Sequence, residues 1–278
     1  MNMTITCGAC RLPLHKPRIM GIINVTPDSF FAGSRCATPH DVLARASLMA
    51  AQGVDIFDVG AYSTRPGAFE VSETEELQRL TAALDVLTAH FPQTMLSVDT
   101  FRASVVERLY NRYGPFIVND VTGGEADPPL LTVTARLQLP YIIMHSRGNP
   151  QTMQQLTGYE DVAHEVVTYL QKKMEACTRM GVRQVMLDPG FGFAKTVKQN
   201  YELFRRIGII AGLGAPVLVG VSRKTMLWKP LGITPEEALT ATAALHLQAL
   251  LQGAHILRVH DVAAARQMIK LCGLLKTC

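Results

Sequence analysis

Eight short apolar runs recur along the 278-residue chain, and they constrain its fold more than any other feature. They are RIMGIIN ending at Asn24, VDIFDVG at Gly60, TMLSVD at Asp99, PFIVND at Asn119 and Asp120, PYIIMH at His145, QVMLD at Asp188, PVLVGVSRK at Lys224, and HILRVH at His260. Short, strongly apolar runs are typical of strands buried on both faces, as in a parallel sheet. Because helix-length segments separate them, we predict an α/β fold, a single (β/α)8 TIM barrel.

Cap residues indicate where the helices between these runs begin. The predicted starts are Thr38-Pro39, Ser72 with Glu75 as a capping box, Thr100 or Ser104, about Tyr159, Thr234-Pro235, and Asp261. The stretch from about Tyr159 to Met180 should stop at Gly181, a typical C-terminal glycine.

The repeat of strand and helix indicates one domain, residues 18–278, after a frayed leader of residues 1–17. Two connections, Thr26 to Thr38 and Ala61 to Val71, are longer and rich in Gly, Pro and Ser. Both follow strands at the predicted mouth of the barrel, where active-site loops lie, although ordinary surface loops have this composition too.

Composition excludes several function classes. The net charge of +4 comes from dispersed basic residues, which argues against a nucleic-acid partner. No signal peptide and no run of eighteen apolar residues is seen, so we expect a cytoplasmic protein without a membrane partner. Among six cysteines only Cys7 and Cys10 form a CxxC, and no second pair completes a zinc site. We expect unpaired thiols in a reducing compartment.

Polar residues at the ends of the predicted strands should converge on one mouth of the barrel. Asn24 can ligate a hard cation or hydrogen-bond a phosphate, or it can simply form a turn. Arg65, in the segment Ser63-Thr64-Arg65-Pro66-Gly67, can present a bidentate fork to an anion, or it can be a solvated loop residue. Arg258 and His260 form a second candidate anion site after the last strand.

Three acceptor-bearing side chains, Asp99, Asn119 and Asp188, end the third, fourth and sixth strands. Together they suit a flat heterocycle with several N–H donors, although a single aspartate at such a place is often only a helix cap. Lys224 can neutralise a carboxylate, polarise a ring carbonyl or act as a nucleophile, and spacing does not choose among these roles.

Eight segments jointly resemble the dihydropteroate synthase family, from about Arg18 to about Gly273. They are MGIINVTPDSF, STRPGA, SVDT, the Asn-Asp after the fourth strand, MHSRGNPQTMQ, LDPGFGF, GVSRK and RVHDV. The resemblance implies condensation of 6-hydroxymethyl-7,8-dihydropterin pyrophosphate with p-aminobenzoate, giving 7,8-dihydropteroate and pyrophosphate in folate synthesis. It also implies a homodimer and inhibition by sulfonamides at the arylamine site.

The resemblance further implies a role for each candidate residue. The pterin would bind Asp99, Asn119, Met144, Asp188, Phe193, Lys224 and Arg258; p-aminobenzoate would bind Thr64, Arg65, Pro66, Ser222 and Lys224; pyrophosphate would bind Asn24, Arg65, Arg258 and His260. Asn24 would also hold Mg²⁺, and Asp99, Lys224 and Arg65 would be the catalytic residues.

Two departures from the family pattern lie in the long loops. Ala61 and Tyr62 stand where many relatives have Gly-Glu, and Ala32 stands where an aspartate is common, with Asp28 as a possible substitute. Ala32 gives support to one rival function, a catalytically silent homologue that binds pterin. The other rival is a methyltetrahydrofolate–corrinoid methyltransferase on the same scaffold, which would not need the SRK lysine together with the STRPG loop. Turnover would separate the silent homologue from the enzyme.

Overall fold

The computed structural model describes residues 3–26, 36, 38–62, 71–148 and 152–277. Eight parallel strands form one sheet in the order β8-β7-β6-β5-β4-β3-β10-β9. They are β3 (Arg18–Asn24), β4 (Ile56–Gly60), β5 (Met95–Asp99), β6 (Ile117–Asp120), β7 (Tyr141–Met144), β8 (Val185–Asp188), β9 (Leu218–Val219) and β10 (Ile256–Val259). A bridge between Leu187 and Val217 joins β8 to the chain entering β9 and brings the sheet near closure.

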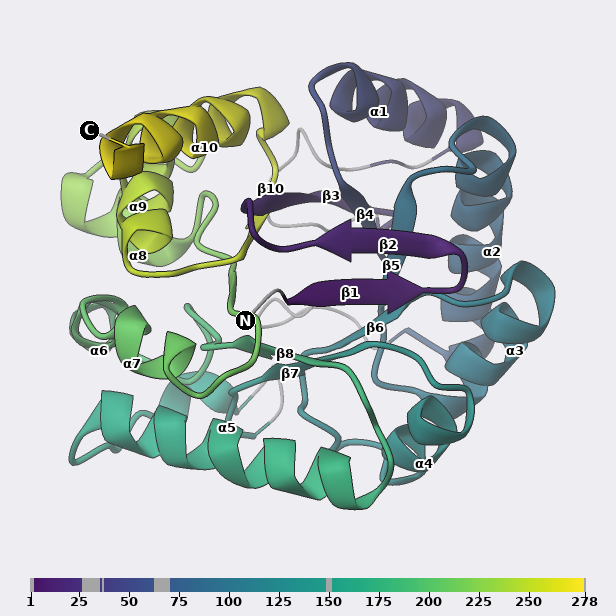
Figure 1. The fold of residues 1–278 in the computed structure, drawn as a ribbon, viewed down its shortest axis with the longest axis horizontal. Coiled ribbons are helices and arrows are strands. Elements are labelled where there is room, and N and C mark those ends of the chain that lie inside the picture. The colour runs from purple at the N-terminus through teal and green to yellow at the C-terminus, as the bar shows by residue number, and fades with distance from the viewer. Residues whose placement is uncertain (1–2, 27–35, 37, 63–70, 149–151, 278) are drawn as a thin grey trace.

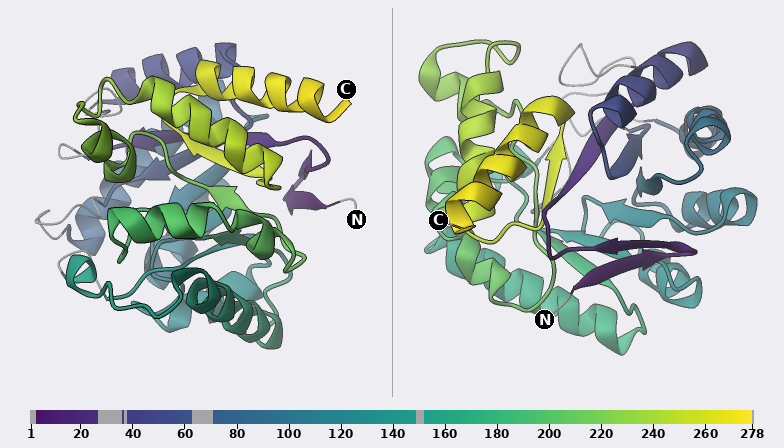
Figure 2. Two further views of the ribbon diagram at one scale, coloured as in Figure 1. Left: turned by 90° about the vertical axis from the view of Figure 1, so that its left-hand side faces the viewer. Right: turned by 45° about the horizontal axis from the view of Figure 1, so that its top comes forward.

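Helices form a ring outside these strands, as Figures 1 and 2 show. They are α1 (Pro39–Ala51), α2 (Glu73–His90), α3 (Ala103–Tyr113), α4 (Pro129–Arg136), α5 (Val162–Arg179), α6 (Val197–Phe204), α7 (Ile207–Ala211), α8 (Thr225–Leu231), α9 (Leu239–Leu251) and α10 (Val262–Thr277). The predicted TIM barrel is therefore confirmed. Within the described residues, no helix is long and apolar enough to span a bilayer.

Most of the predicted helix starts agree with the structure. Thr38 caps α1 in a capping box with Asp41, and the Ser72 side chain caps α2. The predicted stop of α5 is also confirmed, since the helix ends just before Gly181, whose φ of +89° lies in the left-handed region. The long stretch predicted from about Tyr159 begins three residues later, because Asp161 accepts hydrogen bonds as the N-cap of α5.

Two predicted starts were wrong. Neither Thr100 nor Ser104 caps α3, because the Asp127 carboxylate accepts from the backbone N–H of Ala103 at 2.7 Å and supplies the cap from the next loop. The seventh-helix segment at Thr234 forms a separate turn, closed by the Glu237 side chain on the Thr234 N–H at 2.9 Å, and α9 begins only at Leu239.

The strand from the run PVLVGVSRK is also shorter than expected, with two residues in β9. The chain leaves the sheet after Val219 because its next polar groups bond elsewhere. The Arg223 N–H donates to Thr242 Oγ1 at 3.1 Å, and the Ser222 hydroxyl oxygen accepts from the His260 N–H at 3.2 Å.

Residues 1–17 were expected to form a frayed leader. Part of this segment instead forms a hairpin of β1 (Thr4–Cys7) and β2 (Cys10–Pro13), which covers one end of the barrel (Figure 1). Its Ile5 and Cys7 pack on a layer containing one residue from each barrel strand: Met20, Ile56, Met95, Ile117, Ile142, Met186, Leu218 and Ile256. Reciprocal hydrogen bonds between Thr6 and Gln184, at 2.7 and 2.8 Å, fasten the hairpin beside β8. Burial raises the pKa of the Cys7 thiol to about 12, which makes it a poor nucleophile.

This arrangement makes Ile5 a test of whether the hairpin stabilises the barrel. We expect Ile5→Ala to lower the free energy of unfolding by about 2–4 kcal/mol, because the side chain is buried and leaves a cavity. The matched control is Arg11→Ala on the exposed side of β2, which should change it by less than about 0.5 kcal/mol. Urea unfolding followed by circular dichroism measures both, and equal effects would contradict a sealing role.

Candidate active site

Strand register places polar side chains at one level of the barrel mouth. Asn24, Gly60 and Asp99 are paired neighbours at the ends of β3, β4 and β5, and Asn119 of β6 pairs with Asp99. A Cβ at Gly60 would lie 3.3 Å from the Asp99 Cβ and 3.7 Å from the Asn24 Oδ1. Glycine at this position therefore leaves room for the side chains of Asn24 and Asp99 on either side.

Arg258 of β10 binds two carboxylates on β4 and β5, which lie beyond β3 in the sheet. Its Nε donates to Asp58 Oδ2 at 2.7 Å, and its Nη2 donates to Asp99 Oδ2 at 2.7 Å. Asp58 also accepts from Asn119 Nδ2 at 3.2 and 3.3 Å and from Ser97 Oγ at 2.6 Å. The guanidinium and the Asp58 carboxylate together fix two of the predicted pterin residues, Asp99 and Asn119.

Burial, Arg258 and Asp58 together set the protonation of Asp99. Burial raises the pKa of its carboxyl to about 7; Arg258 acts to lower it, while Asp58 raises it further. Two carboxylates that share one guanidinium repel one another, so Asp99 binds a proton far more readily than an exposed aspartate. The group is thus close to the midpoint of its titration near neutral pH.

Lys224 follows β9, the neighbour of β10, and Gly220 leaves room for both its ammonium and the Arg258 side chain: a Cβ there would lie 3.8 Å from Lys224 Nζ and 3.8 Å from Arg258 Cβ. The Lys224 Nζ donates to the Phe191 carbonyl at 2.6 Å and lies 4.9 Å from the centre of the Phe193 ring. Burial lowers the pKa of Lys224 to about 8, and the negative charge of Asp188 partly offsets this effect. Burial likewise raises the pKa of Asp188, with Lys224 as the main opposing charge.

The turn after β8 packs closely on the end of β7. Asp188 Oδ1 accepts from the Gly190 N–H at 2.7 Å. A Cβ at Gly190 would lie 1.9 Å from the His145 carbonyl oxygen and 3.4 Å from the Met144 Cγ, so only glycine fits there. Met144 lies beside Asp188 because the two residues are paired in the register of β7 and β8.

Ser222 and His260 form a second polar group at the mouth. The Ser222 Oγ lies 3.0 Å from His260 Nδ1, and the Arg45 guanidinium donates to the His260 carbonyl. Burial lowers the pKa of His260 to about 3, with the positive charge of Arg258 acting in the same direction. The imidazole is therefore neutral, and it meets an anion as a hydrogen-bonding group without a charge of its own.

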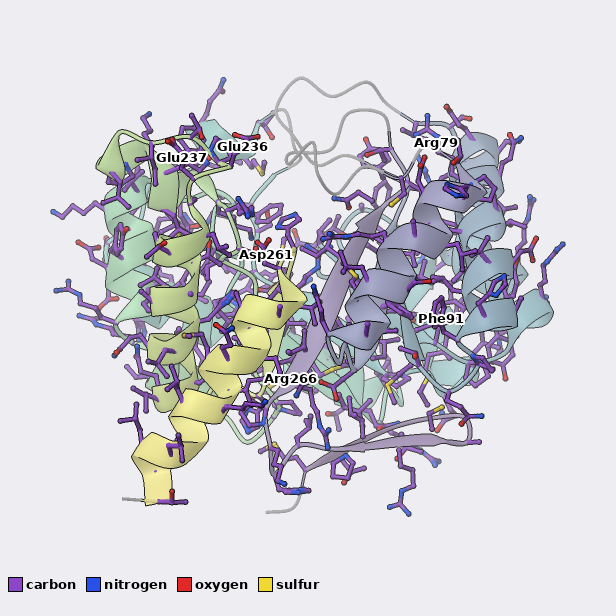
Figure 3. The ribbon with its side chains drawn as sticks, turned by 90° about the horizontal axis from the view of Figure 1, so that it is seen from above. Arg79, Phe91, Glu236, Glu237, Asp261 and Arg266 are labelled. Carbon is purple, nitrogen blue, oxygen red and sulfur yellow. The ribbon has the colours of Figure 1, made fainter. Side chains whose placement is uncertain are left out.

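Arg223 holds the segment that carries Ser222 and Lys224. It forms a bidentate ion pair with Asp261 at 2.8 and 3.0 Å and donates to the carbonyls of Pro235 and Glu236 at 2.8 and 2.6 Å. Figure 3 shows Asp261 at the start of α10, with Glu236 on the turn before α9. Because bidentate pairs restrict orientation, Arg223 fixes the direction of the side chains on either side of it.

Several predicted positions lie outside the described residues: Asp28, Ala32, Thr64, Arg65 and Pro66. The two loop departures that can be placed are Ala61, which is buried, and Tyr62. The Tyr62 ring packs edge-on against Phe101 at 5.3 Å between centroids, and the Arg102 guanidinium lies 5.6 Å from its centre. Tyr62 thus joins an aromatic and cationic cluster after β5.

Sequence reasoning missed two buried charged residues of the mouth, Asp58 and Lys195. An acid within the apolar run VDIFDVG is itself a signal, because a fully buried carboxylate is rarely found without a partner. The lysine that follows LDPGFGFA offers only a weak signal, because a lysine in a loop is usually solvated.

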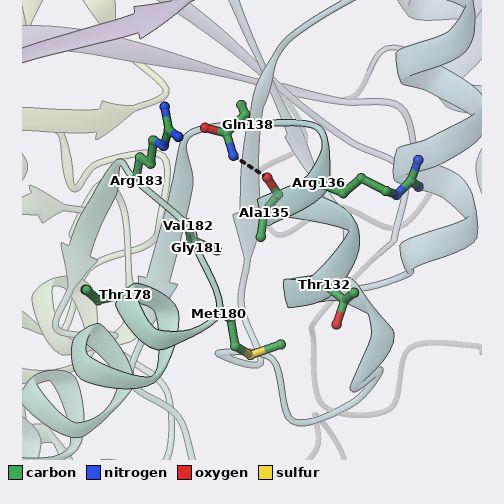
Figure 4. A pocket seen from close by; sticks show the side chains of 9 residues that line it. All are labelled: Thr132, Ala135, Arg136, Gln138, Thr178, Met180, Gly181, Val182 and Arg183. Carbon is green, nitrogen blue, oxygen red and sulfur yellow. Dashed lines mark hydrogen bonds between the residues drawn. The ribbon is translucent and has the colours of Figure 1, made fainter.

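A hollow on the other side of the molecule has no part in this chemistry. It lies between the end of α4 and the turn after α5, where Gln138 Nε2 donates to the Ala135 carbonyl at 2.5 Å (Figure 4). Gln138 and Arg183 precede β7 and β8, so the hollow is at the amino-terminal ends of the strands. Residues at that end of a barrel generally serve stability.

Comparison with known proteins agrees with this geometry. Residues 20–260 match the family described as pterin binding enzyme. The dihydropteroate synthase of Escherichia coli (strain K12) is 42% identical over 262 residues, which cover 94% of this chain and 92% of the relative. Two solved structures are also similar. Yersinia pestis dihydropteroate synthase with a sulfonamide drug complex has a TM-score of 0.94 at 35% identity, covering 99% of this chain and 100% of that one.

The second structure is Xanthomonas albilineans dihydropteroate synthase with 4-aminobenzoic acid, with a TM-score of 0.91 and 35% identity over the full length of both chains. The fold and the site thus define a pterin-binding enzyme. More narrowly, the chain belongs to the dihydropteroate synthase family, which confirms the resemblance seen in the sequence.

The hydrogen bonds of Asp58 with Arg258, Asn119 and Ser97 predict that this carboxylate stabilises the folded protein. We expect Asp58→Asn to lower the free energy of unfolding by about 3 kcal/mol, because Arg258 loses a buried partner and the new amide opposes the Asn119 N–H groups. Asp85→Asn is the control, since its pair with Arg112 is exposed and should be worth less than about 1 kcal/mol. Thermal and urea unfolding of both variants would check this, and equal losses would contradict it.

Proposed function

We propose that the chain condenses 6-hydroxymethyl-7,8-dihydropterin pyrophosphate with p-aminobenzoate in folate synthesis and releases pyrophosphate. The enzyme class follows from family membership over nearly the whole chain. The observation that carries the residue assignment is the joint Asp58–Arg258–Asp99 pairing close to Lys224 and Asp188. These groups present carboxylates, an amide and an ammonium around one pocket, which suits a flat ring with several N–H donors and a carbonyl.

For the pterin, we assign Asp99, Asn119 and Asp188 as acceptors for its N–H groups and Lys224 as the donor to its ring carbonyl. Asn119 is buried and oriented by Asp58, and Lys224 is oriented by the Phe191 carbonyl. The Phe193 ring and the Arg258 guanidinium would pack on the faces of the heterocycle, with Met144 filling the pocket floor. Preoriented partners reduce the entropy lost on binding.

For the chemistry, the protein needs no nucleophile of its own. Loss of pyrophosphate from the electron-rich dihydropterin leaves a cation stabilised by the ring, and the arylamine nitrogen then attacks the methylene carbon. The ionised form of Asp99 would stabilise the positive charge that develops on the pterin. Arg258 and His260, together with Arg65, would hold the departing pyrophosphate, and Thr64, Arg65, Pro66 and Ser222 would hold p-aminobenzoate.

Magnesium would bind at Asn24. The Asn24 amide oxygen lies at the end of β3, with Asp99 across the space that Gly60 leaves open. Mg²⁺ in enzymes commonly takes one or two protein oxygens together with substrate phosphates and water, so this donor set fits the ion. When bound, the ion supplies positive charge to the pyrophosphate leaving group.

We further expect a homodimer in the cytoplasm. Exposed leucines lie on α8, α9 and α10: Leu231, Leu239, Leu251, Leu271, Leu274 and Leu275. Exposed apolar side chains of this kind support association with a second copy. Sedimentation velocity at micromolar concentration measures the dimer directly.

Turnover is the first test of the proposed reaction. With the dihydropterin pyrophosphate and Mg²⁺, we expect pyrophosphate release that depends on p-aminobenzoate and is accompanied by dihydropteroate. Asp99→Asn should lower kcat by about 100-fold, because the charge that faces the developing cation is lost. Asp85→Asn should retain full turnover, since its side chain is half-exposed in a surface ion pair on α2.

Pterin binding without turnover, in the presence of both substrates and Mg²⁺, would instead support the catalytically silent homologue. Methyl transfer from a methyltetrahydrofolate to a corrinoid would support the other rival.

The pH profile gives an independent prediction. Asp99 is ionised above a pKa of about 7, and Lys224 is protonated below a pKa of about 8. Both charged forms coexist mainly between these values, so kcat/KM for the pterin substrate should be bell-shaped with its maximum near pH 7.5. Asp99→Asn should remove the acid limb and keep the alkaline one; an unchanged acid limb would contradict the assignment.

A further inference from the structure

Lys195 is a buried lysine just beyond the turn that follows β8. Its side chain is only 3% exposed, although a lysine is rarely buried unless it is paired. Lys195 is not among the residues that would contact either substrate. Its Nζ lies against the backbone of the turn that carries Phe191 and Phe193.

Three acceptors surround the Lys195 Nζ. The Gly190 carbonyl lies at 2.9 Å, the Phe193 carbonyl at 3.0 Å, and His145 Nδ1 at 3.0 Å. An ammonium group has three N–H donors, so this cage satisfies all of them. His145 can accept because burial, together with the charge of Lys195, lowers its pKa to about 2 and keeps the ring neutral.

The turn that Lys195 holds has an unfavourable backbone. Gly190 and Gly192 have φ values of +69° and +84°, and Ala194 has φ +47°, in a region that residues with a Cβ seldom occupy. Such conformations persist where surrounding contacts determine them. Lys195 supplies such contacts by binding both the Gly190 and the Phe193 carbonyl and linking them to His145 at the end of β7.

This turn carries a large part of the pocket wall. Asp188 begins it, the Phe191 carbonyl accepts from Lys224, and the Phe193 ring lies beneath the Lys224 ammonium. A shift of the turn would therefore move the Asp188 acceptor and the Phe193 ring together, and with them the Lys224 ammonium that the Phe191 carbonyl holds. Displacements of about 1 Å in such groups can cost a large part of the catalytic rate.

We propose that Lys195 is a positioning residue of the pterin site: its ammonium group fixes the Asp188–Phe193 turn against β7 and supports the ionised form of Asp188. The proposal rests on the assignment of Asp188, Phe193 and Lys224 to the pterin. Lys195 touches the turn and His145, and it acts on the ligand only through them.

The surrounding charges explain the second part of this role. Asp188, Lys224, Arg147 and the neutral His145 face Lys195 from the neighbouring elements. Burial lowers the pKa of Lys195 to about 7, while Asp188 raises it. In return, the positive charges of Lys224, Arg258 and Lys195 lower the pKa of Asp188 against the effect of burial. Below pH 7 the charged Lys195 thus favours the carboxylate that accepts from the pterin.

Two variants separate position from charge. Lys195→Met keeps the length and removes every donor, and Lys195→Gln keeps donors without charge. The matched control is Lys198→Met, on a lysine that is 86% exposed on α6. Binding of 6-hydroxymethylpterin, followed by its fluorescence from pH 5.5 to 9, is the readout, together with KM for each substrate, kcat and the thermal midpoint.

We expect Lys195→Met to weaken pterin binding by about 30-fold at pH 6.5, where Lys195 is mostly charged, because two buried carbonyls lose their donor. KM for p-aminobenzoate should change little. Lys195→Gln should restore part of the affinity at pH 8 but show an acid limb of binding displaced to higher pH. Lys198→Met should match the wild type throughout.

Pterin binding within twofold of wild type in folded Lys195→Met, with an unchanged pH profile, would overturn the proposal. So would Lys195→Gln with wild-type affinity and acid limb, which decides the matter if the Met variant does not fold. A lower thermal midpoint with unaltered pterin binding would likewise show a purely structural role. Failure of the wild type and of Lys198→Met to bind pterin would instead count against the proposed function.

Discussion

The site depends on one guanidinium shared by two carboxylates. Arg258 enters from β10 and binds Asp58 on β4 and Asp99 on β5, with β3 lying between β10 and β4 in the sheet. Removing either acid leaves charge that the barrel interior cannot solvate, and removing the arginine leaves two buried acids that repel each other. Because Asp58 also orients Asn119, the ion pair and the polar wall of the pocket form one connected unit.

The acidic and basic side chains of the pocket nearly balance in charge, and two of them, Asp99 and Lys224, have pKa values close to neutral pH. Burial, with the negative charge of Asp58, raises the pKa of Asp99 to about 7, whereas burial lowers the pKa of Lys224 to about 8. Opposed pKa shifts of this kind are characteristic of sites where charge must appear and disappear during a reaction. An anionic leaving group and a cationic pterin fragment arise together in the proposed chemistry, so neither half of the pocket needs a large permanent excess of charge.

The sequence predicts the geometry that is local and misses the geometry that depends on distant contacts. Strand ends such as Asn24, Asp99 and Asp188 could be placed at one mouth because parallel strands of a barrel end at one rim. Asp58 escaped notice because its partner is 200 residues away, and the Asp127 cap of α3 acts from the following loop. The cage around Lys195 likewise requires β7 and the turn after β8 to be assembled first.

The hairpin at the closed end of the barrel has a consequence for the order of folding. Its apolar side rests on a layer that includes Leu218 of β9 and Ile256 of β10, which follow the hairpin by more than about 200 residues in the chain. The hairpin therefore precedes in the chain the strands that bury it, and Ile5 stays exposed to water until β9 and β10 have docked. Contacts of such long sequence separation slow folding and prolong exposure of the free strand edges of β1 and β2. Refolding rate and aggregation during expression would thus depend strongly on the first fifteen or so residues.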